Sequence, residues 1–409
     1  MKITNRFLYV YYGLIAIAII ATAFLEYRVS GFLSYLTILL LFIPLLIRAD
    51  CAPFVISLFV LFGPQLNSSF FNLHTLQLVS ILYPVYYAIV FREQIILKVN
   101  TLVFVVLYFV FAHLFIRDDG SYLVTITTVF FLGSMVTNQR HYLQVAYAFV
   151  VSSLICSIYC YVSLRSFSIG FVDTQIEEKV FDHNPNRIGC TIGLGVIAAT
   201  MLLTNIIQGI KTKGHKVLVV SGLLLSVIAL GLLGSRGALF SCIASSTLLF
   251  FLSPQKIKFK TKWLLLLLSV LSILYVLGVF DYIIYRMTDE ASVDMSGRPE
   301  IWAMKLAYFN QLDGISKMFG IGKDACLNIG YISTHNDFVT ALIAYGYIGV
   351  VLFVFAILFP LLHAKKNKFM VAAMMIFIIG ECCVLEPVFR GYYNILFYYL
   401  FVFKFTTVK

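Results

Sequence analysis

Apolar runs long enough to cross a lipid bilayer recur along the whole of this chain. They are about 17 to 22 residues long, and a helix of about 20 apolar residues spans a hydrocarbon core of roughly 30 Å. Only 12% of the residues are charged, against about 25% in soluble domains. The sequence therefore predicts an all-α, polytopic transmembrane helical bundle that forms one integral membrane domain over residues 1–409.

Fourteen spans are predicted, and the short third and last ones leave a range of about 12 to 14. They lie near residues 7–25, 31–47, 52–66, 75–91, 99–116, 121–137, 142–163, 188–207, 217–233, 237–252, 263–280, 336–362, 369–385 and 391–403. The first has a basic flank and no small-residue cleavage site after it, so we expect it to be retained. The cysteines fall mostly within apolar runs and form no metal or disulfide framework, so we expect small core residues.

The distribution of charge gives an orientation. With the N-terminus in the cytoplasm, 18 of the 30 Lys and Arg residues fall on the inner side and 16 of the 19 carboxylates on the outer side. This agrees with the positive-inside rule and places both termini in the cytoplasm. The net charge of +11 is thus explained by membrane topology, and we expect no nucleic-acid partner.

Arginine departs from that trend. Eight of the twelve arginines fall on the outer side: Arg28, Arg117, Arg165, Arg187, Arg236, Arg286, Arg298 and Arg390. Arginine grips phosphate through a bidentate fork and keeps its charge. The simpler explanation for Arg28, Arg117 and Arg165 is that they lie at helix ends and that their side chains reach the lipid head groups. For the others, the local sequence favours anion binding or leaves it open.

Two outer loops are expected, at residues 164–187 and 281–335. The first ends in His183-Asn-Pro-Asn-Arg187 and opens into a helix, with Asn186 as a candidate N-cap. Arg187 beside a helix N-terminus fits an anion site, and a capped turn with a solvated arginine explains it equally well. A further expectation is an ion pair between Glu386 and Arg390 at the outer end of the thirteenth span.

Arg236 is the only charge between Lys216 and Lys256. An arginine in so apolar a setting needs a partner or a water-filled cavity, and we expect Gly234 and Gly237 to form a tight turn around it. The alternative is a hairpin tip that reaches the head groups, and we favour the functional interpretation.

In the longer outer loop, Arg298 begins a predicted amphipathic helix with Pro299 in its first turn. The apolar residues at helical spacing, which we expect to pack on the membrane domain, are Ile301, Met304, Tyr308 and Leu312. The segment Gly320-Ile-Gly322 is expected to be a turn and not a nucleotide loop, because no strand–helix unit surrounds it.

His335 stands just before the next helix. Thr334 and Asp337 fit a capping box, which leaves His335 and Asn336 without a structural explanation. The helix dipole opposes protonation, so His335 tends toward the neutral form that a general base needs. Gly346 and Gly349 predict close helix packing.

These motifs, taken in order, resemble the O-antigen polymerase and ligase superfamily of the Wzy and WaaL type. They are Gly234-Ser-Arg-Gly, Ser296-Gly-Arg298-Pro-Glu-Ile-Trp, Phe319-Gly-Ile-Gly and His335-Asn followed by Gly346-Tyr-Ile-Gly349. The resemblance covers residues 183–350 with motifs and the rest only as apolar spans. It implies a glycosyltransferase of the GT-C type in the bacterial inner membrane, active at the periplasmic face on undecaprenyl-diphosphate-linked oligosaccharide, without metal or other cofactor.

The resemblance also implies roles for individual residues. Arg236 and Arg298 would hold the diphosphate of the donor, and His335 would deprotonate the acceptor hydroxyl. Further candidates for substrate binding are Arg187, Asn336, Arg286 and Arg390. Fixed guanidinium groups would stabilise the charge that develops on a lipid diphosphate leaving group, and a chain-length regulator and a flippase of the same pathway are candidate partners.

Three functions remain open on the sequence. A polymerase that joins lipid-linked repeat units is favoured, because Ser296-Gly-Arg-x-x-Ile-Trp resembles that branch and the outer loop is compact. A ligase that moves polymer onto lipid A-core is second, and protein O-oligosaccharyltransferases belong to the same superfamily. A transporter without catalysis is less favoured, since Glu381 and Arg236 are the only charges in or near the spans.

Overall fold

The described part of the structure, a computed structural model, is built from helices and contains no strand. It covers residues 52–62, 139–165, 185–209, 212–278, 281, 284, 298–331, 333–364, 367–385 and 393–405. The all-α prediction is confirmed over these residues. The spans predicted at 7–25, 31–47, 75–91, 99–116 and 121–137 lie outside them.

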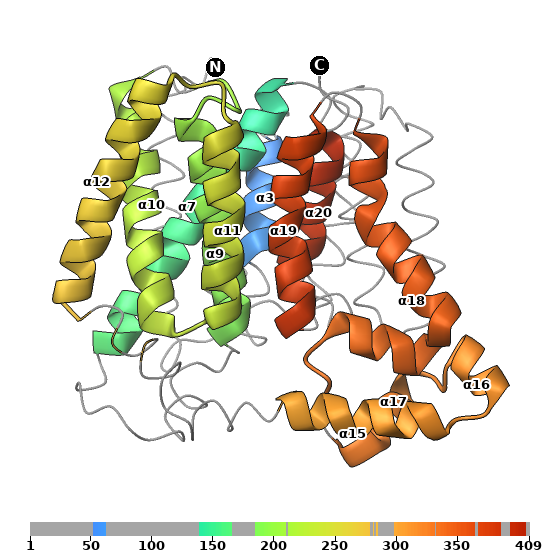
Figure 1. Cartoon of the computed structure of the whole chain (residues 1–409). Helices are drawn as coiled ribbons and strands as arrows, with labels where there is room; N and C mark the ends of the chain where they lie inside the picture. The colour runs from blue at the N-terminus through green and yellow to red at the C-terminus, as the bar shows by residue number, and fades with distance from the viewer. Residues whose placement is uncertain are drawn as a thin grey trace, which may run out of the picture.

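Nine apolar helices form the described bundle, and four short helical segments precede α18 (Figure 1). The bundle contains α3 (Ala52–Phe62), α7 (Gln139–Arg165), α9 (Pro185–Leu203), α10 (Lys213–Leu233), α11 (Arg236–Leu252), α12 (Ile257–Val276), α18 (Asp337–His363), α19 (Lys368–Val384) and α20 (Tyr393–Phe405). The short segments are α15 (Arg298–Gln311), α16 (Gly314–Phe319), α17 (Lys323–Asn328) and the 3-10 turn Ile329–Tyr331. Among the described helices, α7, α10 and α18 are each long and apolar enough to cross a membrane.

One end of the bundle gathers the helix termini that carry lysine. Tyr147 of α7 lies 5.3 Å from His215 of α10 between ring centroids, and Gln255 donates to the Thr204 carbonyl at the end of α9, 3.2 Å away. The starts of α7, α10, α12 and α19 lie at this end (Figure 1). The cations in or next to these helix starts are Arg140, Lys213, Lys216, Lys256, Lys258, Lys260, Lys262 and Lys368. These are the residues that the charge rule assigns to the cytoplasm.

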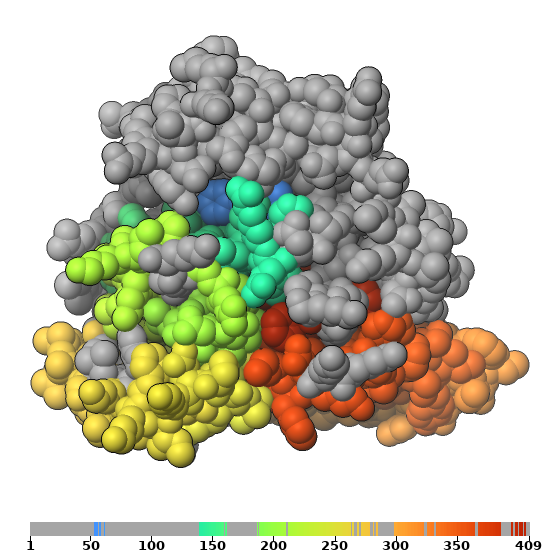
Figure 2. Space-filling view, turned by 90° about the horizontal axis from the view of Figure 1, so that it is seen from above, coloured from blue at the N-terminus to red at the C-terminus, as the bar shows by residue number. Residues whose placement is uncertain are grey.

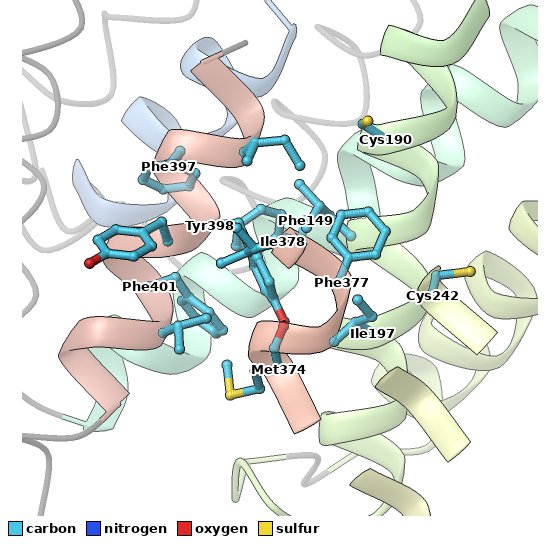
Figure 3. Close-up of a cluster of buried hydrophobic side chains, with 14 of the residues drawn as sticks. Phe149, Cys190, Ile197, Cys242, Met374, Phe377, Ile378, Phe397, Tyr398 and Phe401 are labelled. Atoms are coloured by element: carbon cyan, nitrogen blue, oxygen red, sulfur yellow. The ribbon is translucent and has the colours of Figure 1, made fainter. Parts of the chain in front are cut away.

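The core is centred on α9, which is buried without interruption from Ile188 to Ala199. Helices α7, α10 and α11 surround it (Figure 1). Beside it, Phe149 of α7 packs against Phe397 and Phe401 of α20 at ring-centroid distances of 5.4 and 5.3 Å (Figure 3). This aromatic layer joins helices that are far apart in the sequence.

Small polar contacts add specificity inside the bundle. The Ser153 hydroxyl of α7 lies 2.5 Å from that of Ser226 in α10 and donates to the Ile192 carbonyl of α9 at 3.0 Å. Asn394 of α20 donates to Thr191 of α9 at 3.0 Å. Such contacts between small polar residues are typical of packed membrane helices.

The described cysteines are mainly core residues, as the sequence predicted. All seven lack a disulfide, and six of them are buried: Cys156, Cys160, Cys190, Cys242, Cys326 and Cys382. Cys51 lies outside the described residues.

The loop helix α15 exists as predicted, but its buried face is rotated from the predicted one. Met304 and Tyr308 are exposed, whereas Lys305 and Phe309 are buried. The Lys305 amino group donates to the Cys326 carbonyl at 2.6 Å, and Phe309 meets Tyr347 of α18 edge to face. Apolar spacing alone missed this face, because a lysine can bury its long apolar stem when its amino group finds an acceptor.

Helix α18 changes direction at Gly346, where the backbone is not helical (φ 69°, ψ −167°) (Figure 1). The segment after α16 fills the break. The amides of Ile321 and Gly322 donate to the carbonyls of Ile343 and Ala344 at 3.1 and 2.9 Å. The segment Gly320-Ile-Gly322, which was predicted to be a turn, links α16 to α17. Gly346 was expected to allow two membrane helices to pack closely. It instead leaves room for the backbone of α16, because a Cβ at residue 346 would lie 2.4 Å from the Met318 carbonyl oxygen.

Replacing Gly346 by alanine is expected to destabilise the protein for two reasons, backbone strain and a steric clash. This φ/ψ region is essentially restricted to glycine, at a cost of about 1–3 kcal/mol for other residues, and the contact with Met318 adds to it. The measurement is the thermal unfolding midpoint in detergent. Gly322→Ala (φ 89°, open space around the new Cβ) isolates the strain, and Gly314→Ala, also in open space, is the neutral control. Equal midpoints for all three variants would contradict this account of α18.

Candidate functional site

The candidate site lies at the end of the bundle opposite the lysines, where α10 and α19 end and α9, α11, α15 and α18 begin (Figure 1). Seen from above, residues 213–276 and residues 298–363 lie on different sides of the described part (Figure 2). Helix α19 joins the two sides, since it packs against α11 of the first and α18 of the second. The predicted site residues are distributed over these helix ends.

Arg236 is the first residue of α11 and is partly buried. The preceding Gly234 has the left-handed conformation (φ 63°) that ends α10, so the predicted tight turn is confirmed there. Ser235 donates to the Asn186 side chain at 3.1 Å, which ties this turn to the first turn of α9. The helix start places unsatisfied amide groups beside the Arg236 side chain, a favourable setting for an anion.

Two expectations around this turn need correction. Gly237 is helical and plays no part in the turn; a Cβ there would lie 2.5 Å from Val384 of α19, so its role is close packing. Asn186 is not an N-cap, because α9 already begins at Pro185 and the Asn186 side chain accepts from Ser235 instead. Proline is well suited to the first helical position.

Arg298 is the first residue of α15 and is partly buried. The helix that it begins packs against α18, so the long loop returns to the membrane domain there. Glu300, two residues further on, is exposed. The start of α15 thus brings a second guanidinium group and a second helix N-terminus to the end of the bundle that holds Arg236.

His335 lies in the short link before α18 and is partly buried. Its backbone is left-handed (φ 51°), which is uncommon for a residue other than glycine and is often found where function requires it. Trp302 of α15 donates to the Thr334 carbonyl at 2.7 Å. This contact joins the link that carries His335 to the helix that Arg298 begins.

The cap of α18 differs from the predicted capping box. The N-cap is Asn336, whose side-chain oxygen accepts from the amides of Phe338 and Val339 at 2.9 and 3.2 Å. The Thr334 hydroxyl donates to the Asn336 carbonyl at 2.9 Å. Asn336 therefore has a structural role that the sequence interpretation missed, although asparagine is among the strongest N-cap residues.

Removing this cap gives a testable loss of stability. Asn336→Ala is expected to cost about 1 kcal/mol, whereas Asn336→Asp keeps an acceptor oxygen and should unfold close to the unmodified protein. Thermal unfolding in detergent measures both. Activity assays on Asn336→Asp then separate the cap from substrate binding, since a folded variant that loses turnover would show a role beyond the cap. Indistinguishable unfolding of both variants would exclude the cap as a stabilising contact.

Two carboxyl groups are fully buried at this end, Asp337 and Glu381. Asp337 lies in the first turn of α18, where the helix dipole favours negative charge, and it interacts with the Cys382 thiol of α19. In the loop, the Ser316 hydroxyl and nearby amides hold the pKa of the exposed Asp313 below its usual value. From the sequence, Asp337 was expected to belong to a capping box, whereas Glu381 was assigned no role. The available signal for Glu381 was a single acid within an apolar span.

For the remaining predicted residues, the positions of the side chains are outside what the structure describes. Arg187 lies in the first turn of α9, and its side chain is not described. Arg286, Arg390 and Glu386 lie outside the described residues, so the expected ion pair is untested. Among the described residues no group of three or more His, Cys, Asp and Glu side chains lies close enough to hold a metal ion.

The fold and this arrangement define an all-α membrane protein with two arginines, a histidine and two buried carboxyl groups at one end of its bundle. Residues 221–354 match the Wzy_C family model, described as O-antigen ligase. No curated protein matches the chain significantly. The family match supports a place in the O-antigen ligase and polymerase superfamily, whose members are glycosyltransferase-like enzymes. The matched region contains Arg236, Arg298 and His335.

Proposed function

We propose that this protein is a polymerase of O-antigen or a related surface polysaccharide. In this proposal it transfers a glycan from undecaprenyl diphosphate onto the sugar of another lipid-linked repeat unit, at the periplasmic face of the bacterial inner membrane. The observation that carries the proposal is the pair of arginines at the starts of α11 and α15. The second of these helices is joined to the link that bears His335, because Trp302 of α15 donates to the Thr334 carbonyl.

The proposed chemistry follows from the charges. As the bond between the sugar and the diphosphate breaks, negative charge accumulates on the leaving diphosphate. Arg236, Arg298 and the two helix starts would stabilise that charge. His335 would accept the proton of the attacking hydroxyl as it bonds to the anomeric carbon. The diphosphate departs with the electron pair of the broken bond.

A ligase that transfers finished polymer to lipid A-core is the second candidate, and the description of the matched family as O-antigen ligase favours it. Lipopolysaccharide profiles of a deletion strain separate the two. Core bearing one repeat unit identifies a polymerase, whereas bare core with lipid-linked polymer accumulating identifies a ligase. An unchanged profile would contradict both.

We further propose that transfer needs no divalent metal, because arginine supplies the positive charge. Purified enzyme is expected to keep its turnover in excess chelator. Complete loss of activity in chelator, followed by recovery on adding magnesium or manganese, would contradict this proposal.

A further inference from the structure

Three large apolar side chains of the loop helix α16 point outward, and we refer to them as the α16 cluster. Ile315, Met318 and Phe319 are 75%, 44% and 64% exposed, in a helix that spans Gly314–Phe319. They are three and four residues apart and so lie on one side of the helix, whereas Lys317 lies on the other. An exposed apolar cluster of this kind marks a surface that meets an apolar partner.

The α16 cluster continues directly into an exposed face of α18. The end of α16 packs against the break at Gly346, where a Cβ would lie 2.4 Å from the Met318 carbonyl oxygen and 2.6 Å from that of Lys317. Beyond the break, the exposed apolar residues of α18 lie on one face: Tyr347, Ile348, Val351, Leu352 and Phe355. Because α18 is long and apolar enough to cross a membrane, this face meets lipid. Helix α16 lies beside the end of that face (Figure 1).

Tyr347 indicates the depth at which α16 meets the membrane. It is the first residue after the break, its side chain is 50% exposed, and its ring packs edge to face on Phe309 of α15, 5.5 Å away between centroids. Tyrosine is enriched where the hydrocarbon core gives way to the head groups, because its ring is apolar and its hydroxyl is polar. The end of α16 therefore lies at the boundary between acyl chains and head groups.

The ends of α16 are tied by hydrogen bonds within the loop. The Asp313 carboxylate accepts from the amides of Ile315 and Ser316 at 2.8 and 2.9 Å, and from the Ser316 hydroxyl at 2.7 Å. At the other end, the Gly320 amide donates to the Ser316 carbonyl at 2.7 Å. Unsatisfied amide groups are costly away from water, so these contacts suit a short helix that lies against lipid.

We propose that α16 is a membrane anchor of the loop, with the α16 cluster inserted among lipid acyl chains at this end of the bundle. Amphipathic helices at a membrane surface bury their apolar face about 5–10 Å into this boundary. Because α15 ends at Gln311 and α16 begins at Gly314, the anchor also fixes the depth of α15. The inference goes beyond the proposed function and does not depend on which reaction the protein catalyses.

Quenching of tryptophan fluorescence by brominated lipids tests the anchor, since bromine on an acyl chain quenches only at short range. Phe319→Trp is placed in vesicles of phosphatidylcholine and phosphatidylglycerol, and in the same vesicles made from lipids with brominated acyl chains. The emission of the unmodified protein, which contains Trp263 and Trp302, is subtracted. The added tryptophan is expected to lose about half or more of its emission in the brominated vesicles.

Two further variants serve as controls. Val351→Trp lies on the lipid-facing side of α18 and should be quenched. Ala303→Trp should lose little emission, because Ala303 is exposed on α15 and lies about 200° around the helix from the buried Lys305. Quenching in Val351→Trp without quenching in Phe319→Trp would overturn the inference and leave the α16 cluster to a protein partner or a second copy of this chain. Equal quenching in Ala303→Trp and Phe319→Trp would overturn it too, since α16 would then be no distinct anchor.

A charge within the α16 cluster gives a second test. Adding Ile315→Glu to Phe319→Trp is expected to reduce the quenching about twofold or more, because a carboxylate is costly among acyl chains, whereas adding Ile315→Leu should preserve it. Ile315 is largely exposed, so both variants should unfold in detergent at close to the same temperature as Phe319→Trp alone. Unchanged quenching after Ile315→Glu would show that the apolar side chains do not hold α16 in the lipid. None of these readouts uses turnover, so the inference and the proposed function can fail separately.

Discussion

Replacing His335 by asparagine is expected to lower turnover by about 10²–10⁴-fold, the usual contribution of a general base. Asparagine is chosen because it tolerates the left-handed backbone that His335 adopts (φ 51°), whereas alanine would add strain. The binding of lipid-linked donor should change little, since a base acts mainly in the transition state. Turnover and donor binding are measured on the same purified protein.

His363→Asn is the control for this experiment. His363 lies in the last turn of α18, the helix that follows His335, and this turn is at the opposite end of the bundle. It should keep turnover within about twofold. Full turnover in His335→Asn would remove His335 from the chemistry. The base would then be sought at Asp337 or Glu300, of which Asp337 is fully buried and Glu300 exposed.

Replacing Arg236 by lysine is expected to lower polymer synthesis by about 10²-fold or more. Lysine keeps the charge but loses the planar fork that pairs with two phosphate oxygens, and removing one fixed donor from a transition state costs roughly 10²–10³ in rate. Polymer formation from lipid-linked repeat units, normalised to the amount of folded enzyme, gives the measurement.

Arg140→Lys is the control, because it makes the same replacement far from the candidate site, near the start of α7 at the lysine-rich end of the bundle. It should leave synthesis unchanged. If Arg236→Lys and Arg140→Lys gave equal rates, a phosphate-binding fork at Arg236 would be excluded.

Much of the described fold could be predicted from apolar length. The predicted span 237–252 agrees with α11 at Arg236–Leu252, and the predicted span 369–385 agrees with α19 at Lys368–Val384. The signal is strong because a membrane helix must be apolar around its whole circumference over many residues. It says nothing about which face of a span packs inward. The buried face of α15 was predicted from apolar spacing instead, and it was wrong because Lys305 is buried with its amino group on the Cys326 carbonyl.

The details of the candidate site depend on local geometry that spacing does not contain. Thr334 and Asn336 both suit an N-cap, and the choice between them depends on the left-handed backbone at His335. The break at Gly346 has a glycine as its only local signal. Its existence depends on amides from residues 321 and 322, which lie more than twenty residues earlier in the chain.

The packing of α15 against α18 was also beyond the sequence. Arg298 was singled out for its place at a helix start, but nothing in the spacing indicated that Trp302 of the same helix meets the Thr334 carbonyl. That contact depends on how the loop folds back over the bundle. The assignment of Arg236, Arg298 and His335 to one reaction stays a prediction, which the substitutions above test.

The change of direction at Gly346 alters how α18 relates to the thickness of the bilayer. A straight helix over Asp337–His363 would be about 40 Å long at 1.5 Å per residue, which exceeds a hydrocarbon core of roughly 30 Å. The turn leaves residues 347–363, about 26 Å of helix, to cross the lipid. The first part of α18 is thereby free to run along the membrane surface. In the proposed orientation, a diphosphate confined to head-group depth would approach this segment from the side, without its lipid tail leaving the membrane.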